Sequence, residues 1–428
     1  MKKKLLAVGL LAAASLATSS PANAAFVVGG ENGWQLSTDG IIDVFSYYHS
    51  TQKAPNGPRA ASLLDGGADS YNQRFGVGVG LLPSVVAFNV KAPTTNGVDS
   101  SVRVGIYPSI QNQNDTRFNV GPNIDFREMF YTAKGAYGEL LAGRALNLFQ
   151  GKNILTDMTL LTAGVVGGRG NTVTLGHIAS GYLYTGFGPQ IRYTTPDMGG
   201  VKVALEIAEP YKITADTAKT SSPRIEAEVS YAKTYGSTAV SAWVSGLYQT
   251  APRATGSKTT TTDTVTPITN VVTRTTTTTP IARAGKDDES IGGAYGVSVG
   301  FSGLNLLASG YGGRGLGMLS TQDGDILGGS TSDENGRTRL HWGYLLQATY
   351  KVTPSVMIGA NYGQTRQERN NGETLIAMKN QESGVATITY NLNKFTQFVG
   401  EYIYAQNTWM DGAKQHSNQF ALGTMFYW

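Results

Sequence analysis

Apolar and polar positions alternate along most of the chain in stretches of roughly ten residues, separated by turn residues. In residues 200–210 (GVKVALEIAEP), every second residue from Val201 to Ile207 is apolar, while Lys202 and Glu206 fall on the other face. Residues 337–350 (RTRLHWGYLLQATY) repeat this pattern. Side chains of a β-strand point to opposite faces in turn, so the alternation predicts an all-β protein with two-faced strands.

The connections between these stretches are alternately short and long. Short connections fall near residues 93–97, 135–138, 196–200, 235–237, 302–303, 352–354 and 391–393. Long polar segments fall at 50–69, 112–122, 148–187, 210–223, 249–289, 314–336, 368–380 and 408–414. Seven short turns and eight long loops predict about 16 antiparallel strands with both chain ends on the short-turn side. Tyr71 to Ala92 is either one long strand or a strand interrupted at Leu82-Pro83.

Composition decides which face is outside. Alternation alone also fits a soluble sandwich whose apolar face is buried. Here the polar faces carry many of the 54 glycines and several charges, which suits a water-filled lumen, and the apolar faces often end in Tyr, Trp or Phe. In lipid such a sheet must close, because an open edge leaves unpaired backbone groups. We therefore expect a transmembrane antiparallel β-barrel that closes without any cysteine.

The first 24 residues read as a secretory signal peptide. A basic start, an apolar stretch from Leu5 to Ala17 and the small-residue end Ala22-Asn23-Ala24 follow one another. We expect export through the Sec pathway and a mature barrel of residues 25–428. Without Lys2, Lys3 and Lys4 the formal net charge of +4 falls near +1, which gives no reason to expect a nucleic-acid partner.

Two loops differ from the others. Residues 249–289 are Thr-rich and too polar to pack a core, so we expect a mobile external loop. Residues 148–187 contain LFQGKNILTDMTLLTAGVV, whose apolar side chains need a surface to pack on. A loop folded into the barrel, as a constriction, would provide that surface.

Two segments carry a family resemblance. Residues 125–149 (DFREMFYTAKGAYGELLAGRALNLF) and 188–210 (GPQIRYTTPDMGGVKVALEIAEP) resemble the strands around the third long loop of the general diffusion porins of Gram-negative outer membranes, most like the β-proteobacterial type. The resemblance implies a homotrimer of 16-stranded barrels in the outer membrane, in contact with lipid and lipopolysaccharide. It also implies passive diffusion of ions and small hydrophilic solutes, and a third loop whose acids face a basic wall.

Strand parity places four arginines toward the lumen. Arg74, Arg103, Arg127 and Arg192 each alternate with apolar neighbours. A charge on the lipid face would cost roughly 2–4 kcal/mol at the midplane. The arginines are therefore predicted to form the basic wall of the constriction, with structural ion pairs as the alternative for some of them.

Few acids oppose these arginines on the loop. Asp157 is the only acid between Ala145 and Thr195, which favours weak anion selectivity. The same parity argument sends five further acids into the lumen: Asp39, Asp43, Asp125, Glu226 and Glu228.

Other residues are predicted to lie on the outer face. Parity places Phe126, Glu128 and Phe130 outward on one strand and Arg144 outward on the next, and two charged groups there suggest a trimer contact. The last strand presents one bulky face, made of Phe420, Leu422, Phe426 and Trp428. Under the resemblance this face is the signal that the barrel-assembly machinery recognises.

Two enzyme-like motifs occur in the sequence, but neither lies in the secondary structure that its function requires. Gly296-Val297-Ser298-Val299-Gly300 matches a nucleophile pattern but lies inside an alternating strand, and residues 310–315 match G-x-G-x-x-G without a following helix. Histidines 49, 177, 341 and 416 lack metal-site spacing, so we expect no cofactor, no metal and no enzyme. A solute-specific porin with a binding track at Tyr182 and Tyr184, and an occluded barrel acting as an adhesin or an enzyme, stay open as alternatives.

Overall fold

The protein is described from a computed structural model. The structure describes residues 26–55, 64, 73–110, 124–164, 174–214, 216–217, 222–265, 272–320 and 331–428. The predicted signal peptide at 1–24 lies outside this part of the chain. Within it, no helix has the length and hydropathy that a membrane-spanning helix requires.

Strands make up almost all of the regular structure. In chain order the first ten are β1 (Phe26–Gly29), β2 (Gln35–Thr51), β3 (Gln73–Gly78), β4 (Val85–Lys91), β5 (Asp99–Pro108), β6 (Ile124–Gly135), β7 (Gly138–Leu146), β8 (Phe187–Thr194), β9 (Val201–Ala208) and β10 (Arg224–Tyr235). The others are β11 (Thr238–Pro252), β12 (Ser257–Val265), β13 (Val272–Pro280), β14 (Asp287–Phe301), β15 (Leu304–Arg314), β16 (Leu340–Lys351), β17 (Val356–Gln367), β18 (Met378–Asn391), β19 (Thr396–Trp409) and β20 (Lys414–Tyr427). Two short helices, α1 (Gly151–Thr156) and the 3-10 helix η2 (Met158–Leu161), follow β7.

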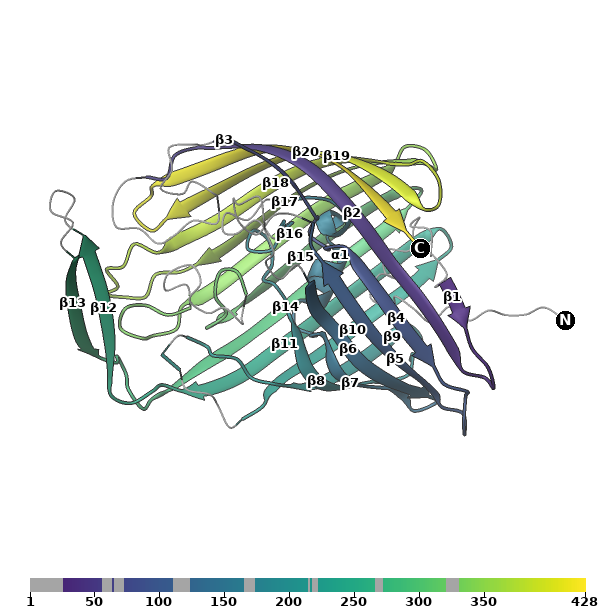
Figure 1. The fold of residues 1–428 in the computed structure, drawn as a ribbon, viewed down its shortest axis with the longest axis horizontal. Helices are drawn as coiled ribbons and strands as arrows, with labels where there is room; N and C mark the ends of the chain where they lie inside the picture. Colours follow the sequence, from purple (N-terminus) through teal and green to yellow (C-terminus); the bar gives the residue numbers. More distant parts are fainter. Residues whose placement is uncertain are drawn as a thin grey trace.

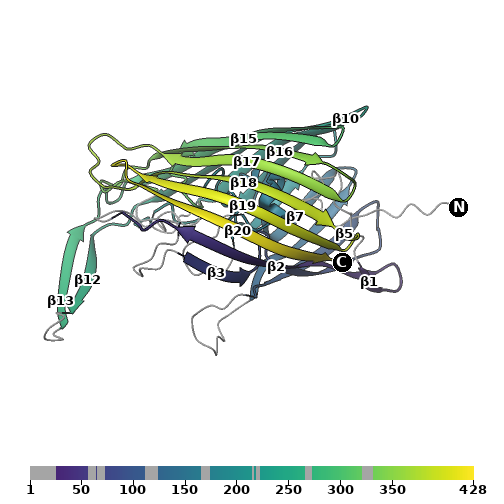
Figure 2. The ribbon, with the colours of Figure 1, turned by 90° about the horizontal axis from the view of Figure 1, so that it is seen from above.

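The sheet closes into an antiparallel barrel (Figure 1). Neighbouring strands of the wall follow one another along the chain, except that β3 and β4 both pair with β2 and β11 pairs with β14. The last strand, β20, pairs with β2 from Ile41↔Tyr427 to Thr51↔Ser417. With β1 left out and β3 and β4 counted as one interrupted strand, the wall has 16 strands. The C-terminus and β1, the first described strand, lie at the short-turn end, opposite the β12–β13 hairpin, in both views (Figures 1 and 2). The predicted barrel, its strand number and the side of its termini are confirmed.

The segment Tyr71–Ala92 is interrupted. Strands β3 and β4 both pair with β2, through Phe45↔Gly78 and Ile41↔Val85. Residues 79–84 between them leave the wall and turn into the barrel, where Val79 and Leu81 are buried. Of the two alternatives, the interrupted strand is therefore the right one, and we call residues 79–84 the inward turn.

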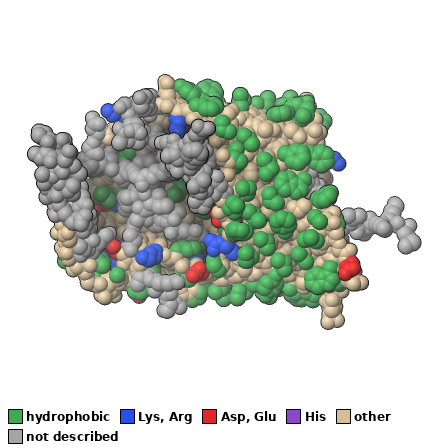
Figure 3. Space-filling view, viewed as in Figure 1, with side chains coloured by type: hydrophobic (Ala, Val, Ile, Leu, Met, Phe, Trp, Pro, Cys, Tyr) green, Lys and Arg blue, Asp and Glu red, His purple; other side chains and the backbone are tan. Residues whose placement is uncertain are grey.

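The outer face of the wall is apolar. Hydrophobic side chains cover the wall between its two ends (Figure 3). Phe420, Leu422 and Phe426 are exposed on the outside of β20, as predicted from parity. Trp428 exchanges two backbone hydrogen bonds with Gly40, and its ring lies where a side chain on Gly40 would stand. The bulky face of the last strand thus extends over the strand that closes the barrel.

The Thr-rich loop contains regular structure. Strand β11 runs on to Pro252 and β14 begins at Asp287, so the loop is shorter than the predicted 249–289. Its strands β12 and β13 pair with each other from Ser257↔Pro280 to Val265↔Val272, outside the barrel sheet (Figure 1). A run of β-branched threonines favours extended backbone even without a core to pack on.

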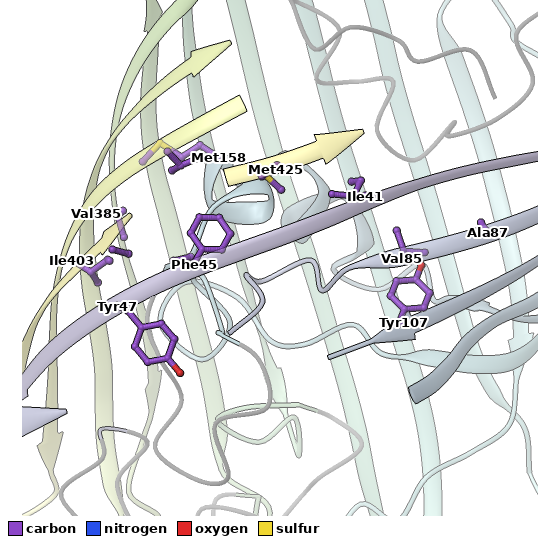
Figure 4. Packing of buried hydrophobic residues seen from close by; sticks show 13 residues of the cluster. Ile41, Phe45, Tyr47, Val85, Ala87, Tyr107, Met158, Val385, Ile403 and Met425 are labelled. Carbon is purple, nitrogen blue, oxygen red and sulfur yellow. The ribbon is translucent and has the colours of Figure 1, made fainter. Parts of the chain in front are cut away.

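The interior is partly filled. A buried apolar cluster joins inner residues of β2, β18, β19 and β20 to Met158 of η2. Figure 4 shows Met158 beside Met425, with Phe45 of β2 next to them. The lumen face is therefore less polar than expected on this side, because part of it packs against a loop instead of water.

Candidate pore constriction

The segment between β7 and β8 folds into the barrel, as predicted. We call residues 147–186 the constriction loop; residues 165–173 of it lie outside the described part. Helix α1 is one and a half turns long, and Asp157 follows it in extended conformation and caps η2 by accepting a hydrogen bond from Thr159 N at 2.9 Å. An Asp at this position satisfies a backbone donor that the short helix leaves unpaired.

Hydrogen bonds fasten the constriction loop to the inner wall of β10–β20. The Glu401 carboxylate accepts from Thr162 Oγ1 at 2.6 Å and from Gly164 N at 2.7 Å. Gln347 Oε1 accepts from Met158 N at 2.7 Å. Further along, Glu226 Oε2 on β10 accepts from the backbone N of Phe149 at 2.6 Å. Inward polar residues on this half of the barrel therefore serve to hold the loop.

Asp157 is buried within the loop. Its carboxylate accepts hydrogen bonds from Tyr182 Oη at 2.6 Å, Thr159 Oγ1 at 2.5 Å and Asn361 Nδ2 at 3.3 Å. It is fully buried, and Tyr182 beside it is buried too. The expectation that Asp157 faces the basic wall as an open acid is wrong, because these donors enclose its charge. Burial and the neighbouring Asp157 charge also raise the pKa of Tyr182 well above its usual value.

The inward turn contacts the constriction loop inside the barrel. Leu81 N donates to Thr162 O and Leu82 N donates to Leu160 O, each at 3.2 Å. Asp43, buried on β2, accepts from Gly80 N at 2.5 Å and from Ser84 Oγ at 2.7 Å. Asp43 does point inward, as predicted, but it holds the inward turn and does not face an open lumen.

Arg103 is engaged in a structural ion-pair network. Its Nε donates to Glu128 Oε2 at 2.8 Å, and Nη1 lies 2.9 Å from Asp39 Oδ2. Asn89 Oδ1 accepts a third bond, at 3.0 Å. Only 14% of the Arg103 side chain is exposed. Arg103 therefore has the alternative role considered above, that of a structural ion pair, because two carboxylates neutralise its charge.

Glu128 points inward, so its predicted outer placement is wrong. The pairing of β5 and β6 shifts register: Gly105 faces Glu128, whereas Ile106 faces Phe126. The extra residue, Arg127, forms a bulge that reverses the parity of the strand beyond it. For the same reason Phe130 is not outward; Met129 and Tyr131 are the exposed residues. The sequence alternation gave no sign of this bulge.

Arg127 keeps an exposed surface. It lies 5.4 Å from the centroid of the Tyr107 ring, and its Nε pairs with Asp125 Oδ2 at 2.7 Å. The Arg127 side chain is 20% exposed and that of Asp125 is 57% exposed. Such an exposed pair is weakly bound, so the guanidinium stays available to mobile ions.

A second basic group lies at the base of the loop. Arg192 on β8 is partly exposed, and its Nη1 donates to Leu146 O at 3.2 Å. Lys152 on α1, which is 33% exposed, lies 3.6 Å from the buried Glu228. Glu226 and Glu228 point inward, as predicted, but both are buried.

Arg74 and Arg144 lie on opposite faces of the wall. Arg74 pairs in register with buried His49 and is exposed, on the face opposite outward Phe75. Arg144 is exposed beside Met129 on the outer face. The structure thus brings Arg74, Arg127 and Arg192 to the inner face with partial exposure and leaves Arg144 outside.

Three residues of the site were not predicted. Tyr107 underlies Arg127, and Tyr107 Oη donates to Glu128 at 2.8 Å. Arg224 and Glu206 are buried beside Glu226 at the base of the loop. Their inward parity was visible in the sequence, but burial by the loop was not. Among the described residues, no group of three potential metal ligands comes together.

Comparison with known proteins gives a family and a fold. A family profile described as Gram-negative porin matches residues 9–409. No match is found among curated proteins. The outer membrane channel DcaP of Acinetobacter baumannii is similar in structure, with a TM-score of 0.62 and 13% identity over 94% of this chain and 100% of that one.

Two other solved structures are similar. The anion-selective porin from Comamonas acidovorans has a TM-score of 0.60 and 16% identity, covering 92% of this chain and 100% of its own. An in-vitro folded trimer form of OmpT from Vibrio cholerae has a TM-score of 0.52 and 12% identity, covering 93% and 100%. At these identities the likeness extends to the fold alone.

Proposed function

The chain belongs to the Gram-negative porin family and is an outer-membrane channel, and on that premise we propose that it passes ions and small hydrophilic solutes by passive diffusion, with a weak preference for anions. Charge on the accessible inner wall decides which ions are favoured near a constriction. The proposal assigns that role to Arg74, Arg127 and Arg192, aided by Lys152.

One observation carries the anion preference. The inward acids Asp39, Asp43 and Asp157 are buried, and so are four inward glutamates: Glu206, Glu226, Glu228 and Glu401. Asp125 differs, because its side chain is 57% exposed, but it is paired with Arg127. Arg127 and Lys152 are 20% and 33% exposed, and Arg74 is exposed. Mobile ions therefore meet positive charge more often than negative charge. The name of the anion-selective porin from Comamonas acidovorans agrees with this reading.

Passive diffusion is favoured over a dedicated binding track. Tyr182, one of the two tyrosines that would form such a track, is fully buried and bonded to Asp157. A planar-bilayer recording tests the difference. Conductance that rises linearly with KCl concentration supports diffusion, whereas saturation at low concentration supports a binding track. A folded barrel without conductance would favour the occluded alternative.

We also propose a homotrimer with Arg144 at the contact. Arg144 is charged and exposed on the outer face, where a charge against lipid is unfavourable. The trimer form of OmpT from Vibrio cholerae shows that this fold type can associate in threes. If the channel closes in three steps and Arg144→Glu abolishes that pattern, the result supports a trimer contact at Arg144. If Arg144→Glu leaves the three-step closure unchanged, Arg144 is not part of the contact.

The remaining proposals concern export and assembly. Residues 1–24 are the segment removed after Sec export, and the outer face of Phe420, Leu422, Phe426 and Trp428 is the surface that the assembly machinery reads. Exposure of Phe420, Leu422 and Phe426 on β20 supports this role. Phe426→Ser and Trp428→Ser together should lower the yield of folded barrel in cells more than refolding in detergent.

A further inference from the structure

The constriction loop and the inward turn present apolar side chains to the lumen. Along the described parts of the loop, residues 147–164 and 174–186, the asparagine, glutamine, aspartate, serine, threonine and histidine residues are all buried. The residues that keep exposed surface there are Lys152, Leu155, Leu161, Leu175 and Tyr184. In the inward turn, which lies wholly within the described part of the chain, Leu82 alone does so. We call Leu82, Leu155, Leu161, Leu175 and Tyr184 the apolar ledge.

The apolar ledge rests on buried packing. Leu155, Leu175 and Tyr184 lie against a buried apolar cluster inside the barrel, and Leu161 lies against the cluster that contains Met158. Leu82 contacts both clusters. Its backbone N also donates to the residue before Leu161 on the loop. The ledge is therefore held in place across the join between the inward turn and the loop.

The polar side chains of the loop are buried because the loop uses them for its own hydrogen bonds. Gln150 Oε1 accepts from the backbone N of Leu183 at 2.8 Å. Asn153 Oδ1 accepts from Trp243 Nε1 on β11 at 3.0 Å. Two short helices leave several backbone groups without a helical partner, and buried polar groups must be paired. Apolar side chains are consequently left to face the lumen.

Positive charge lies next to the apolar ledge. Tyr184 is within electrostatic range of Arg127, which keeps 20% of its side chain exposed. On the loop itself, Lys152 and Leu155 are three residues apart on α1, so they lie on neighbouring positions of one helix face. Lys152 is 33% exposed. A solute in the constriction therefore meets cationic groups and apolar surface together.

This combination treats two kinds of anion differently. An inorganic anion gains from the cationic groups, but the apolar ledge offers nothing in exchange for its water. An organic anion can direct its carboxylate to a cationic side chain and lay its apolar body on the ledge. Apolar area is then removed from water on both partners, which is favourable.

We propose that the constriction favours organic monoanions with an apolar body over hydroxylated anions of the same charge. The arginines and Lys152 hold the carboxylate, and the apolar ledge contacts the body. The contact is shallow, since the ledge residues are partly exposed and rest on packed clusters, so the solute is not retained. The inference rests on the proposed conduction of anions and adds a substrate class to it.

Zero-current potentials of single channels, with KCl on one side and potassium hexanoate or potassium gluconate on the other, test the proposal. Both anions are six-carbon monocarboxylates, but gluconate carries hydroxyl groups along its chain. We expect the hexanoate-to-gluconate permeability ratio to be about tenfold above the ratio of their mobilities in water. Leu155→Asn and Leu161→Asn should each lower it about threefold, close to the effect of one methylene group withdrawn from water. Leu161→Met, which stays apolar, should preserve the ratio.

Leu392→Asn is the matched control. Leu392 is 54% exposed in the short connection between β18 and β19, away from the constriction loop, so this change should leave the ratio unchanged. A ratio equal to that of the mobilities would overturn the proposal. So would a high ratio that Leu155→Asn and Leu161→Asn leave unchanged, because size alone would then exclude gluconate.

A KCl gradient applied to the same channels separates this inference from the function on which it rests. A cation-selective sign would contradict the proposed anion preference, and the inference with it. An anion-selective sign, together with a hexanoate-to-gluconate ratio no higher than that of the mobilities, would contradict the substrate class alone.

Discussion

The two halves of the inner wall use charge differently. On β10–β20, inward acids such as Glu226 and Glu401 are buried and accept hydrogen bonds from the constriction loop. On β3–β8, Arg74, Arg127 and Arg192 keep exposed surface. Inward carboxylates therefore hold the loop on one side, whereas inward arginines stay partly exposed on the other. The difference follows from whether the loop, the inward turn or side-chain partners cover the residue.

The largest effect is expected at Arg103. It lies on the same side of the wall as the exposed arginines, but Asp39 and Glu128 hold it in ion pairs. Arg103→Gln leaves Asp39 and Glu128 without their counter-charge, so we expect a loss of about 3–5 kcal/mol in the free energy of unfolding. Denaturant unfolding in detergent micelles measures it. Arg127→Gln is the control, with an expected loss within about 1 kcal/mol because its pair is exposed. Similar losses for the two arginines would break the distinction.

Asp157 tests the side of the barrel on which buried acids hold the constriction loop. Asp157→Ala removes the acceptor of Tyr182 Oη, Thr159 N and Thr159 Oγ1, which are buried. We expect a loss of roughly 2–3 kcal/mol. Open-channel current noise should rise because the loop loses its internal support. Asp125→Ala, at an exposed acid, should change neither quantity; a quiet, stable Asp157→Ala channel would show that the loop is held without this acid.

The smallest expected effect concerns the inward turn. Ser84→Ala removes the hydroxyl that donates to buried Asp43 at 2.7 Å, and we expect a loss of about 1 kcal/mol. Ser46→Ala removes a hydroxyl that donates to Leu422 O in an exposed setting and should cost less. An equal cost for both serines would indicate that the inward turn adds little to stability.

Most of the barrel could be predicted because its signal is local. Alternation with period two marks each strand, and turn composition marks each connection, so strand number and the side of the termini followed from the sequence. The bulge at Arg127 could not be predicted this way. One residue of β6 is skipped in the pairing with β5, and no residue type in the sequence marks this place. The bulge reverses which side chains point inward, so the predicted outward placements of Glu128 and Phe130 are wrong.

The sequence predicted which charged side chains point inward, but not which of them are buried. Parity correctly placed Asp39, Asp43 and Glu226 inward. It could not show that Arg103, the constriction loop or the inward turn would cover them, because those contacts join residues far apart in the chain. For the same reason Asp157 looked like an open acid, although Tyr182 and Asn361 enclose it.

The most direct test of the central claim is the zero-current potential of single channels in a tenfold KCl gradient. The account predicts the anion-selective sign for the unaltered chain, a smaller potential of that sign for Arg127→Gln, and a potential for Asp157→Asn close to that of the unaltered chain. A cation-selective sign in the unaltered chain, or a larger change from Asp157→Asn than from Arg127→Gln, would contradict it.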